Sequence, residues 1–107
     1  AVQGIGQIMG ENMVWEEGSG QMVSGSFMDY TLPRADDCPN FELGDNEVPT
    51  PTNPMGIKGA GEAGCVGAMP AVMNAICDAL STRGVHTFDM PASPNRIWQA
   101  LQESHRL

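Results

Sequence analysis

The stretch from Gly56 to Gly64 holds the residues of this sequence that are best suited to chemistry. A single carboxylate, Glu62, lies among its glycines, and Lys58 is the only basic residue in the stretch. Glycines allow a backbone to approach a bulky ligand closely, with N–H groups available to bind it. A carboxylate carried by such a loop can act as a general base toward the bound ligand. Catalysis by Glu62 is therefore one interpretation of this stretch.

Two other interpretations of the same stretch must be weighed. A carboxylate near the start of a helix is stabilised by the helix dipole by about 0.3 to 1 kcal/mol, so Glu62 can be purely structural. Gly59, Gly61 and Gly64 also satisfy the GxGxxG pattern of dinucleotide-binding folds. That pattern needs a buried strand before it, and the prolines between residues 49 and 54 leave little room for one. Glu62 would moreover repel a pyrophosphate, which disfavours the nucleotide fold.

The cysteines and histidines do not form a metal-binding pattern. Cys38, Cys65 and Cys77 match neither a CxxC pair nor a zinc-knuckle spacing. His86 and His105 have no cysteine or carboxylate at ligand spacing. We therefore expect no metal bound directly by these side chains, and we interpret the cysteines as three reduced thiols of a cytoplasmic protein.

Length and charge bound the remaining classes of function. The chain has 107 residues, enough for a single domain, 1–107. Its 13 acidic residues against 5 basic ones give a net charge of −8, which argues against nucleic acid as a partner. The negative charge lies in residues 1–62, an acidic and loop-rich half, whereas residues 63–107 form a neutral, helical half. Glycine, proline or charge interrupts every apolar stretch, so we expect no membrane span. Charged residues are only 17% of the chain, which suggests that another chain covers part of its surface.

The pattern of apolar residues predicts two to three helices and a small antiparallel sheet or hairpin, an α+β fold. The first helix follows an apolar face that recurs at Val2, Ile5, Met9 and Met13. Residues 13–15 and 21–23 read as two strands joined by a glycine-containing turn. Short strands are also expected at residues 41–43 and 85–88.

The second half of the chain predicts its helices more clearly. An apolar stripe predicts a helix over residues 66–83, formed by Val72, Met73, Ile76 and Leu80. Pro70 is expected in its first turn and Gly84 as its C-cap. Ser93 and Pro94 predict the start of a short closing helix.

Four segments of the chain, in order, resemble the C-terminal end of the large, molybdenum-binding subunit of the xanthine dehydrogenase family. The resemblance is closest to its aldehyde oxidase and aerobic carbon monoxide dehydrogenase-like branch. The segments are VQGIGQ at 2–7, GSFMDY with LPRAD at 25–36, PTNPMGIKGAGEAG at 51–64, and MPASP at 90–94. Lys-Gly-x-Gly-Glu-Ala-Gly is the most specific of these motifs. The resemblance implies that the chain is part of a larger molybdopterin-binding domain.

What the family does is implied by this resemblance alone. Its members are oxidoreductases in which a pterin dinucleotide holds molybdenum, and a glutamate of the Gly-Glu motif deprotonates a hydroxyl on the metal. The residue in that position here is Glu62, and Lys58, Gly59 and Gly61 fall beside the cofactor. The activated oxygen then hydroxylates an aldehyde, an N-heterocycle or carbon monoxide. Because the pterin sulfurs bind the metal, no protein ligand is required.

The same resemblance implies partners. Family members pass electrons to iron–sulfur and FAD groups in partner subunits or domains, and their large subunits are several times longer than this chain. We therefore expect the chain to contact the remainder of the large subunit and to be inactive in isolation. An alternative is a non-catalytic docking domain that keeps the same fold and serves an interface.

Overall fold

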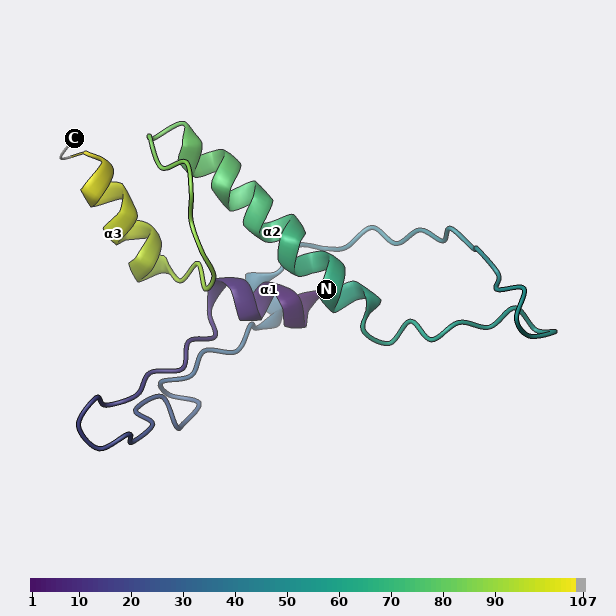
Figure 1. Cartoon of the computed structure of the whole chain (residues 1–107), viewed down its shortest axis with the longest axis horizontal. Helices are drawn as coiled ribbons and strands as arrows, with labels where there is room; N and C mark the ends of the chain where they lie inside the picture. Colours follow the sequence, from purple (N-terminus) through teal and green to yellow (C-terminus); the bar gives the residue numbers. More distant parts are fainter. Residues whose placement is uncertain (106–107) are drawn as a thin grey trace.

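The computed structural model describes residues 1–105 and contains three α-helices joined by long connections (Figure 1). Helix α1 spans Val2–Met9, α2 spans Ala63–Ser81 and α3 spans Pro94–Ser104. A single 3-10 turn, η1, covers Ala35–Asp37. The three helices agree with the number predicted from the apolar pattern.

The predicted antiparallel sheet is wrong. Residues 1–105 contain no β-strand, and the 13–15 and 21–23 segments meet only at one isolated bridge, between Trp15 and Met22. A two-stranded ladder is marginal in water unless a further strand or a helix covers it. The described part of the chain covers this turn poorly, since Trp15 is 54% exposed. The chain is therefore a helical segment and not an α+β fold.

The two other predicted strands are also absent. Residues 41–43 and 85–88 are extended backbone without a pairing partner. The apolar pattern identified residues that need covering, but within residues 1–105 no neighbouring strand exists to pair with them.

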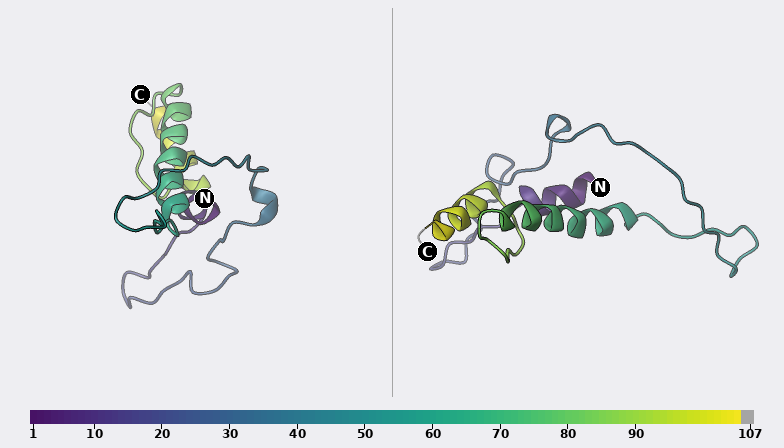
Figure 2. Two further views of the ribbon diagram at one scale, coloured as in Figure 1. Left: turned by 90° about the vertical axis from the view of Figure 1, so that its right-hand side faces the viewer. Right: turned by 90° about the horizontal axis from the view of Figure 1, so that it is seen from above.

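Helix α1 packs against the first half of α2, as two views show (Figures 1 and 2). Gly4 makes this contact possible: a Cβ there would lie 2.7 Å from the carbonyl oxygen of Cys65 and 3.1 Å from the Cβ of Ala68. At the other end of α1, the Ala92 N–H donates a 2.6 Å hydrogen bond to the carbonyl oxygen of Ile8, which is fully buried. Residues 84 positions apart in sequence, Ile8 and Ala92, are thereby joined.

Helix α2 begins at Ala63, directly after Glu62, and ends at Ser81. Because it starts three residues earlier than predicted, Pro70 lies inside the helix and not in its first turn, so that expectation is wrong. Gly84 lies beyond the C-cap with a φ of +81°, a conformation that favours glycine. Helix α3 begins at Pro94 with Ser93 before it, as predicted.

The length and composition of α2 also suit a membrane span. An 18-residue window of this helix has a mean hydropathy of 1.4, and 6% of the window is buried within the chain. The argument that every apolar stretch is interrupted therefore does not hold for α2. A helix in the core of a larger protein has the same composition, and the contact with α1 shows that α2 packs against protein.

The chain is far more open than a self-contained domain of its size. Its accessible surface is 8650 Å², whereas a folded monomer of 11.4 kDa exposes about 5,800 Å². Its radius of gyration is 18.2 Å, against about 13 Å for a compact domain of this length. Among residues 1–105, the buried apolar core consists of Ile8, Leu80 and Ala92. Residues 40–62, hereafter the arm, extend away from the helices (Figure 1).

Candidate functional site

Glu62 occupies the N-cap position of α2, where the arm meets the helix. Its carbonyl oxygen accepts a 2.9 Å hydrogen bond from the N–H of Val66, and the Ala63 N–H donates to Ala60 at 3.2 Å. The carboxylate itself makes no capping hydrogen bond, and the residue is exposed. The backbone of Glu62 is therefore fixed by the helix, while its side chain points out of the fold without a cap partner.

An open concavity of about 650 Å³ lies beside this carboxylate. It is lined by Gly59, Ala60, Gly61, Glu62, Ala63, Val66 and Gly67. A Cβ built on Gly59 or Gly61 would meet no atom of the chain within 4 Å. These two glycines are therefore not required by packing inside the described part of the chain, and the space in front of them is free for a molecule from outside.

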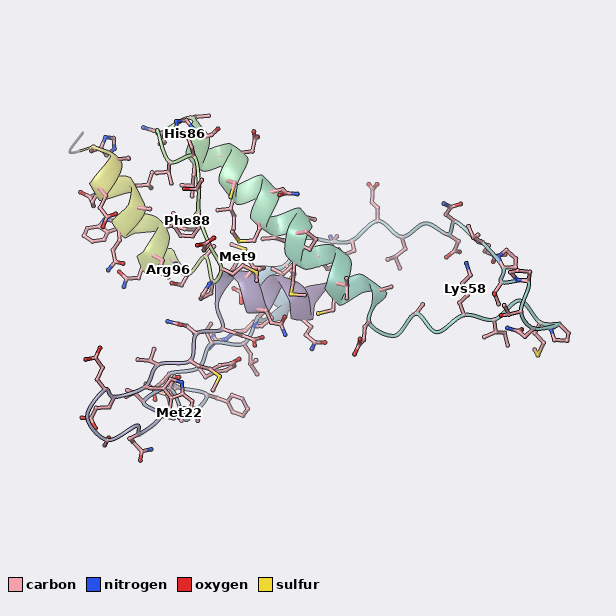
Figure 3. The ribbon with its side chains drawn as sticks, in the orientation of Figure 1. Met9, Met22, Lys58, His86, Phe88 and Arg96 are labelled. Atoms are coloured by element: carbon pink, nitrogen blue, oxygen red, sulfur yellow. The ribbon has the colours of Figure 1, made fainter. Side chains whose placement is uncertain are left out.

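The four residues selected from the sequence do not all lie in this concavity. Gly59, Gly61 and Glu62 line it, but Lys58 does not. Figure 3 shows the Lys58 side chain on the arm, away from the helices. Their roles toward a cofactor stay predictions, because the structure carries no ligand.

A tight turn precedes the Lys58–Glu62 loop, and sequence reasoning did not single out the residue at its centre. The side-chain amide of Asn53 accepts hydrogen bonds from the N–H groups of Met55 and Ile57, both at 3.1 Å. The same amide donates to the carbonyl oxygen of Ile57 at 2.9 Å. The Asn-Pro dipeptide, with Gly56 after it, is the sequence signal that could have identified this turn.

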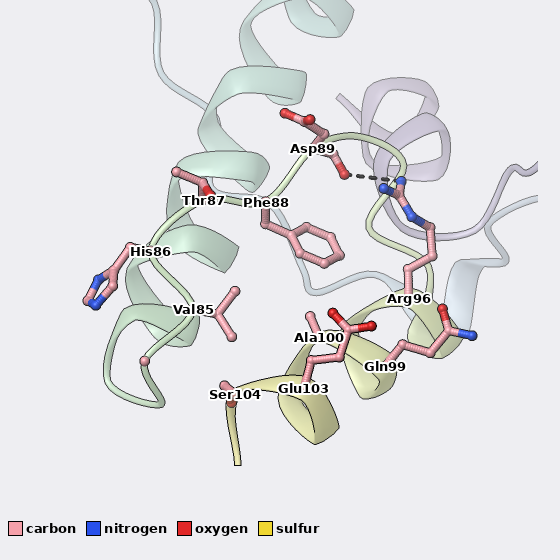
Figure 4. A pocket seen from close by; sticks show the side chains of 11 residues that line it. Val85, His86, Thr87, Phe88, Asp89, Arg96, Gln99, Ala100, Glu103 and Ser104 are labelled. Atoms are coloured by element: carbon pink, nitrogen blue, oxygen red, sulfur yellow. Dashed lines mark hydrogen bonds between the residues drawn. The ribbon is translucent and has the colours of Figure 1, made fainter. Parts of the chain in front are cut away.

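A second concavity, of about 470 Å³, lies between residues 84–89 and α3 (Figure 4). Arg96 closes one side of it by donating to the carbonyl oxygens of Asp89 at 3.1 Å and Pro91 at 2.6 Å. The guanidinium also lies 5.4 Å from the centre of the Phe88 ring. Since these contacts fasten the 84–91 segment to α3, Arg96 has a structural role, and none of the site residues selected from the sequence lies here.

A third polar contact joins the end of α1 to the 26–30 turn. The Tyr30 hydroxyl donates a 2.6 Å hydrogen bond to a carboxylate oxygen of Glu11. This hydrogen bond raises the pKa of the Tyr30 phenol above its usual 10.0, and desolvation and the Glu11 charge act in the same direction. The turn itself is held by Ser26, whose hydroxyl donates to Asp29 at 2.9 Å.

Fold and site together define a helical segment with a glycine loop and one carboxylate beside a concavity that the segment itself leaves open. Comparisons with known proteins show which proteins contain a similar segment. Residues 1–39 match the family model described as a molybdopterin cofactor-binding domain. The crystal structure of quinoline 2-oxidoreductase from Pseudomonas putida 86 superposes with a TM-score of 0.87 and 37% sequence identity, over 95% of this chain and 13% of that one.

Two curated relatives extend this result. The chain is 44% identical, over 95% of its length, to the 6-hydroxypseudooxynicotine dehydrogenase complex subunit gamma of Paenarthrobacter nicotinovorans. It is 35% identical, over 94% of its length, to the carbon monoxide dehydrogenase large chain of Hydrogenophaga pseudoflava. The chain spans 13% and 12% of these relatives, about an eighth of each. Over the segment that it spans, the chain is therefore similar to part of the large, molybdopterin-binding subunit of molybdenum hydroxylases, which confirms the resemblance inferred from its motifs.

Proposed function

We propose that the parent subunit is a molybdopterin-dependent oxidoreductase that hydroxylates an aldehyde, an N-heterocycle or carbon monoxide, and that Glu62 is its general base. One observation carries the proposal: the uncapped, exposed carboxylate of Glu62 stands at the start of α2, beside a concavity that the chain leaves open. The relatives, which include a 6-hydroxypseudooxynicotine dehydrogenase complex subunit and a carbon monoxide dehydrogenase large chain by name, support this substrate range.

The residues present leave room for a bulky cofactor. The open space before Gly59 and Gly61 admits a ligand to within contact of the backbone. Residues 1–105 contain no cluster of His, Cys, Asp or Glu that could hold a metal ion. When bound, this cofactor supplies oxygen transfer to the substrate and accepts its electrons.

In this proposal the chain contributes position and proton transfer. Gly59 and Gly61 allow the backbone to pass beside the cofactor, with Lys58 nearby on the arm. An Oε atom of Glu62 takes up the proton whose removal generates the nucleophile. The helical N-cap position fixes the Cα from which the carboxylate extends. Water must be excluded for such a base to be effective, and the remainder of the large subunit would close the concavity.

Electrons would leave through iron–sulfur and FAD groups in partner subunits or domains.

Cys38, Cys65 and Cys77 are free thiols in the structure, which fits the cytoplasmic location that we assign to the assembly.

The chain alone should be inactive. Its surface exceeds that of a compact domain of equal mass by about 2,900 Å², an area within the range buried by permanent interfaces. That excess is the surface we assign to contact with the remainder of the subunit.

A non-catalytic docking role is the second candidate, and the exposed apolar side chains favour it. Phe27 is 83% exposed and Met28 is 93% exposed, on a turn that Ser26 and Asp29 hold in shape. Such a turn would serve an interface whether or not Glu62 acts as a base. The two candidates therefore differ only in what happens when the carboxylate is removed.

The test is Glu62→Gln in the intact large subunit with its partners. We expect turnover to fall by about 10²- to 10⁴-fold, the usual contribution of a general base, while molybdenum content stays unchanged. Glu47→Gln, at another exposed glutamate of the arm, is the matched control and should retain full turnover. Unchanged turnover in Glu62→Gln would establish the docking role instead. Loss of molybdenum in parallel with activity would make Glu62 structural.

A further inference from the structure

The turn over residues 49–57 is organised by one side chain. Both the N–H and the C=O of Ile57 are bound by the amide of Asn53, through Oδ1 at 3.1 Å and Nδ2 at 2.9 Å. Oδ1 also accepts the Met55 N–H, and the Asn53 carbonyl oxygen accepts the Gly56 N–H at 3.1 Å. Asn53 is partly exposed, and its amide hydrogen bonds show that the side chain is directed at the backbone of its own turn.

The backbone around Asn53 admits one conformation. Gly56 has a φ of +66°, and a Cβ at this position would lie 2.8 Å from the Cβ of Pro49. The Gly56 carbonyl oxygen accepts a hydrogen bond from the Thr50 N–H at 3.1 Å, which joins the two sides of the turn. A glycine is required here both by its φ and by the lack of space. The turn is therefore a local structure that does not depend on the helices.

Ile57 is the residue directly before the Lys58–Glu62 loop. The other end of the loop is fixed at Glu62, whose carbonyl oxygen is bound within α2 by the N–H of Val66. Between the two ends, in the part of the chain that the structure describes, the backbone of residues 58–61 takes part in a single hydrogen bond, from the Ala63 N–H to Ala60. Two of those four residues are glycines, which restrict the path least. Within the described residues, the fixed points of the loop are therefore its two ends.

We propose that Asn53 is a positioning residue: by holding both backbone polar groups of Ile57, it fixes the entry to the Lys58–Glu62 loop and so the path that brings Gly59 and Gly61 to the Glu62 carboxylate. It acts through the loop and touches neither substrate nor cofactor. The inference rests on the proposed role of Glu62 as the base. A neutral amide suits this role, because its Nδ2 donates to one group of Ile57 while its Oδ1 accepts from the other.

The experiment compares Asn53→Ala with Asn46→Ala in the intact subunit. Asn46 is an exposed asparagine of the arm whose side chain makes no hydrogen bond within residues 1–105. We expect kcat to fall by about 10- to 100-fold in Asn53→Ala, the cost of a reacting group displaced by about 1 Å, with a smaller change in KM and full molybdenum content. Asn46→Ala should resemble the parent enzyme. Asn53→Asp keeps the two accepted bonds and loses the donated one, so its kcat should lie between those of Asn53→Ala and the parent.

A double-mutant cycle separates positioning from general stability. If Asn53 acts through the Glu62 carboxylate, Asn53→Ala should cost little further activity once Glu62→Gln is present. An equal fold-loss in both backgrounds would overturn the proposal, as would unchanged kcat in Asn53→Ala. If Asn53→Ala fails to accumulate, Asn53→Asp carries the same cycle. Molybdenum lost in proportion to activity in both variants would also overturn it.

The same cycle distinguishes the two levels of failure. Full turnover in Glu62→Gln refutes the general base, and the positioning role with it. Lost turnover in Glu62→Gln together with normal turnover in Asn53→Ala refutes the positioning role alone.

Discussion

Replacement of Gly61 by alanine tests whether the space beside Glu62 is used by a cofactor. Gly61 lines the 650 Å³ concavity, and a Cβ there would meet no atom of the chain within 4 Å. Gly61 is also not among the glycines with positive φ, so alanine fits its backbone conformation. The chain itself therefore has no reason to require glycine at this position.

The expected magnitudes differ between the free and the loaded subunit. For the subunit without cofactor, a Gly→Ala change at a compatible position stabilises by about 0.4 to 1 kcal/mol, because the unfolded chain loses freedom. If a cofactor lies against the loop, the added methyl group overpacks that contact at a cost of about 1 to 3 kcal/mol. That cost corresponds to cofactor binding weakened by about 5- to 150-fold.

The assay measures thermal stability of the cofactor-free subunit and its molybdenum content after loading at limiting cofactor. Gly44→Ala is the matched control, because Gly44 also lies on the arm, also lacks a positive φ, and also has nothing within 4 Å of a Cβ. We expect Gly44→Ala to load normally and Gly61→Ala to load poorly, with both apo proteins at least as stable as the parent. Equal loading of the two variants would refute the assignment of this concavity to the cofactor. A destabilised apo Gly61→Ala would show that packing inside the subunit requires the glycine.

Two further predictions concern the chain outside the loop. Tyr30 is the only tyrosine of the sequence, so the absorbance of its ionised phenol in the 107-residue chain should report a pKa above 10.0, and this pKa should fall in Glu11→Gln. Because the pKa is raised in the folded state, the contact stabilises the fold fully below pH 10.0, and this stabilisation is lost as the pH rises through the folded pKa. An ordinary pKa in both forms would show that the hydrogen bond is not made. In the isolated chain, amide exchange should be faster across the arm, residues 40–62, than across α2, because the arm has few backbone hydrogen bonds and little burial. Equal protection of the two would contradict the view that the arm needs the rest of the subunit to be held in place.

The helices could be predicted from the sequence because their signals are local. The stripe ending at Leu80 and the Ser93–Pro94 start each lie within one or two turns of the helix that they specify. The predicted start of α2 is three residues too late, because the prediction puts Pro70 in the first turn, whereas the glycine-rich residues before Pro70 are already helical. A proline in the interior removes one backbone bond, and the rest of the helix compensates for that loss.

The sheet could not be predicted correctly because strand pairing depends on what lies beside a segment. The 13–23 region has the sequence of a hairpin and forms the turn, yet its sides join only at Trp15 and Met22. Alternating apolar residues show that a surface must be covered, but they do not say whether a strand of the same segment or a distant part of the subunit covers it. The candidate site could be predicted for a different reason: Glu62 and its glycines are contiguous in sequence, so one motif contains them, and their roles stay predictions. The Asn53 turn could not be predicted from a side-chain inventory, because the hydrogen bonds of Asn53 go to backbone groups.

The open shape of the chain and its high structural similarity to a complete enzyme have one explanation. A TM-score of 0.87 over 95% of the chain means that the extended arm and the exposed helix follow the same course as in a solved subunit in which this segment is 13% of the whole. A segment with three buried apolar residues cannot hold such a course through its own core. Its contribution is instead made of a few small devices: the Asn53 turn and the N-cap of α2 are local, and the Gly4 crossing joins α1 to α2. Those devices lie at the two ends of the glycine loop and beneath the first turn of α2, so the segment itself holds the backbone around Glu62, while the concavity beside Glu62 stays open within the described residues.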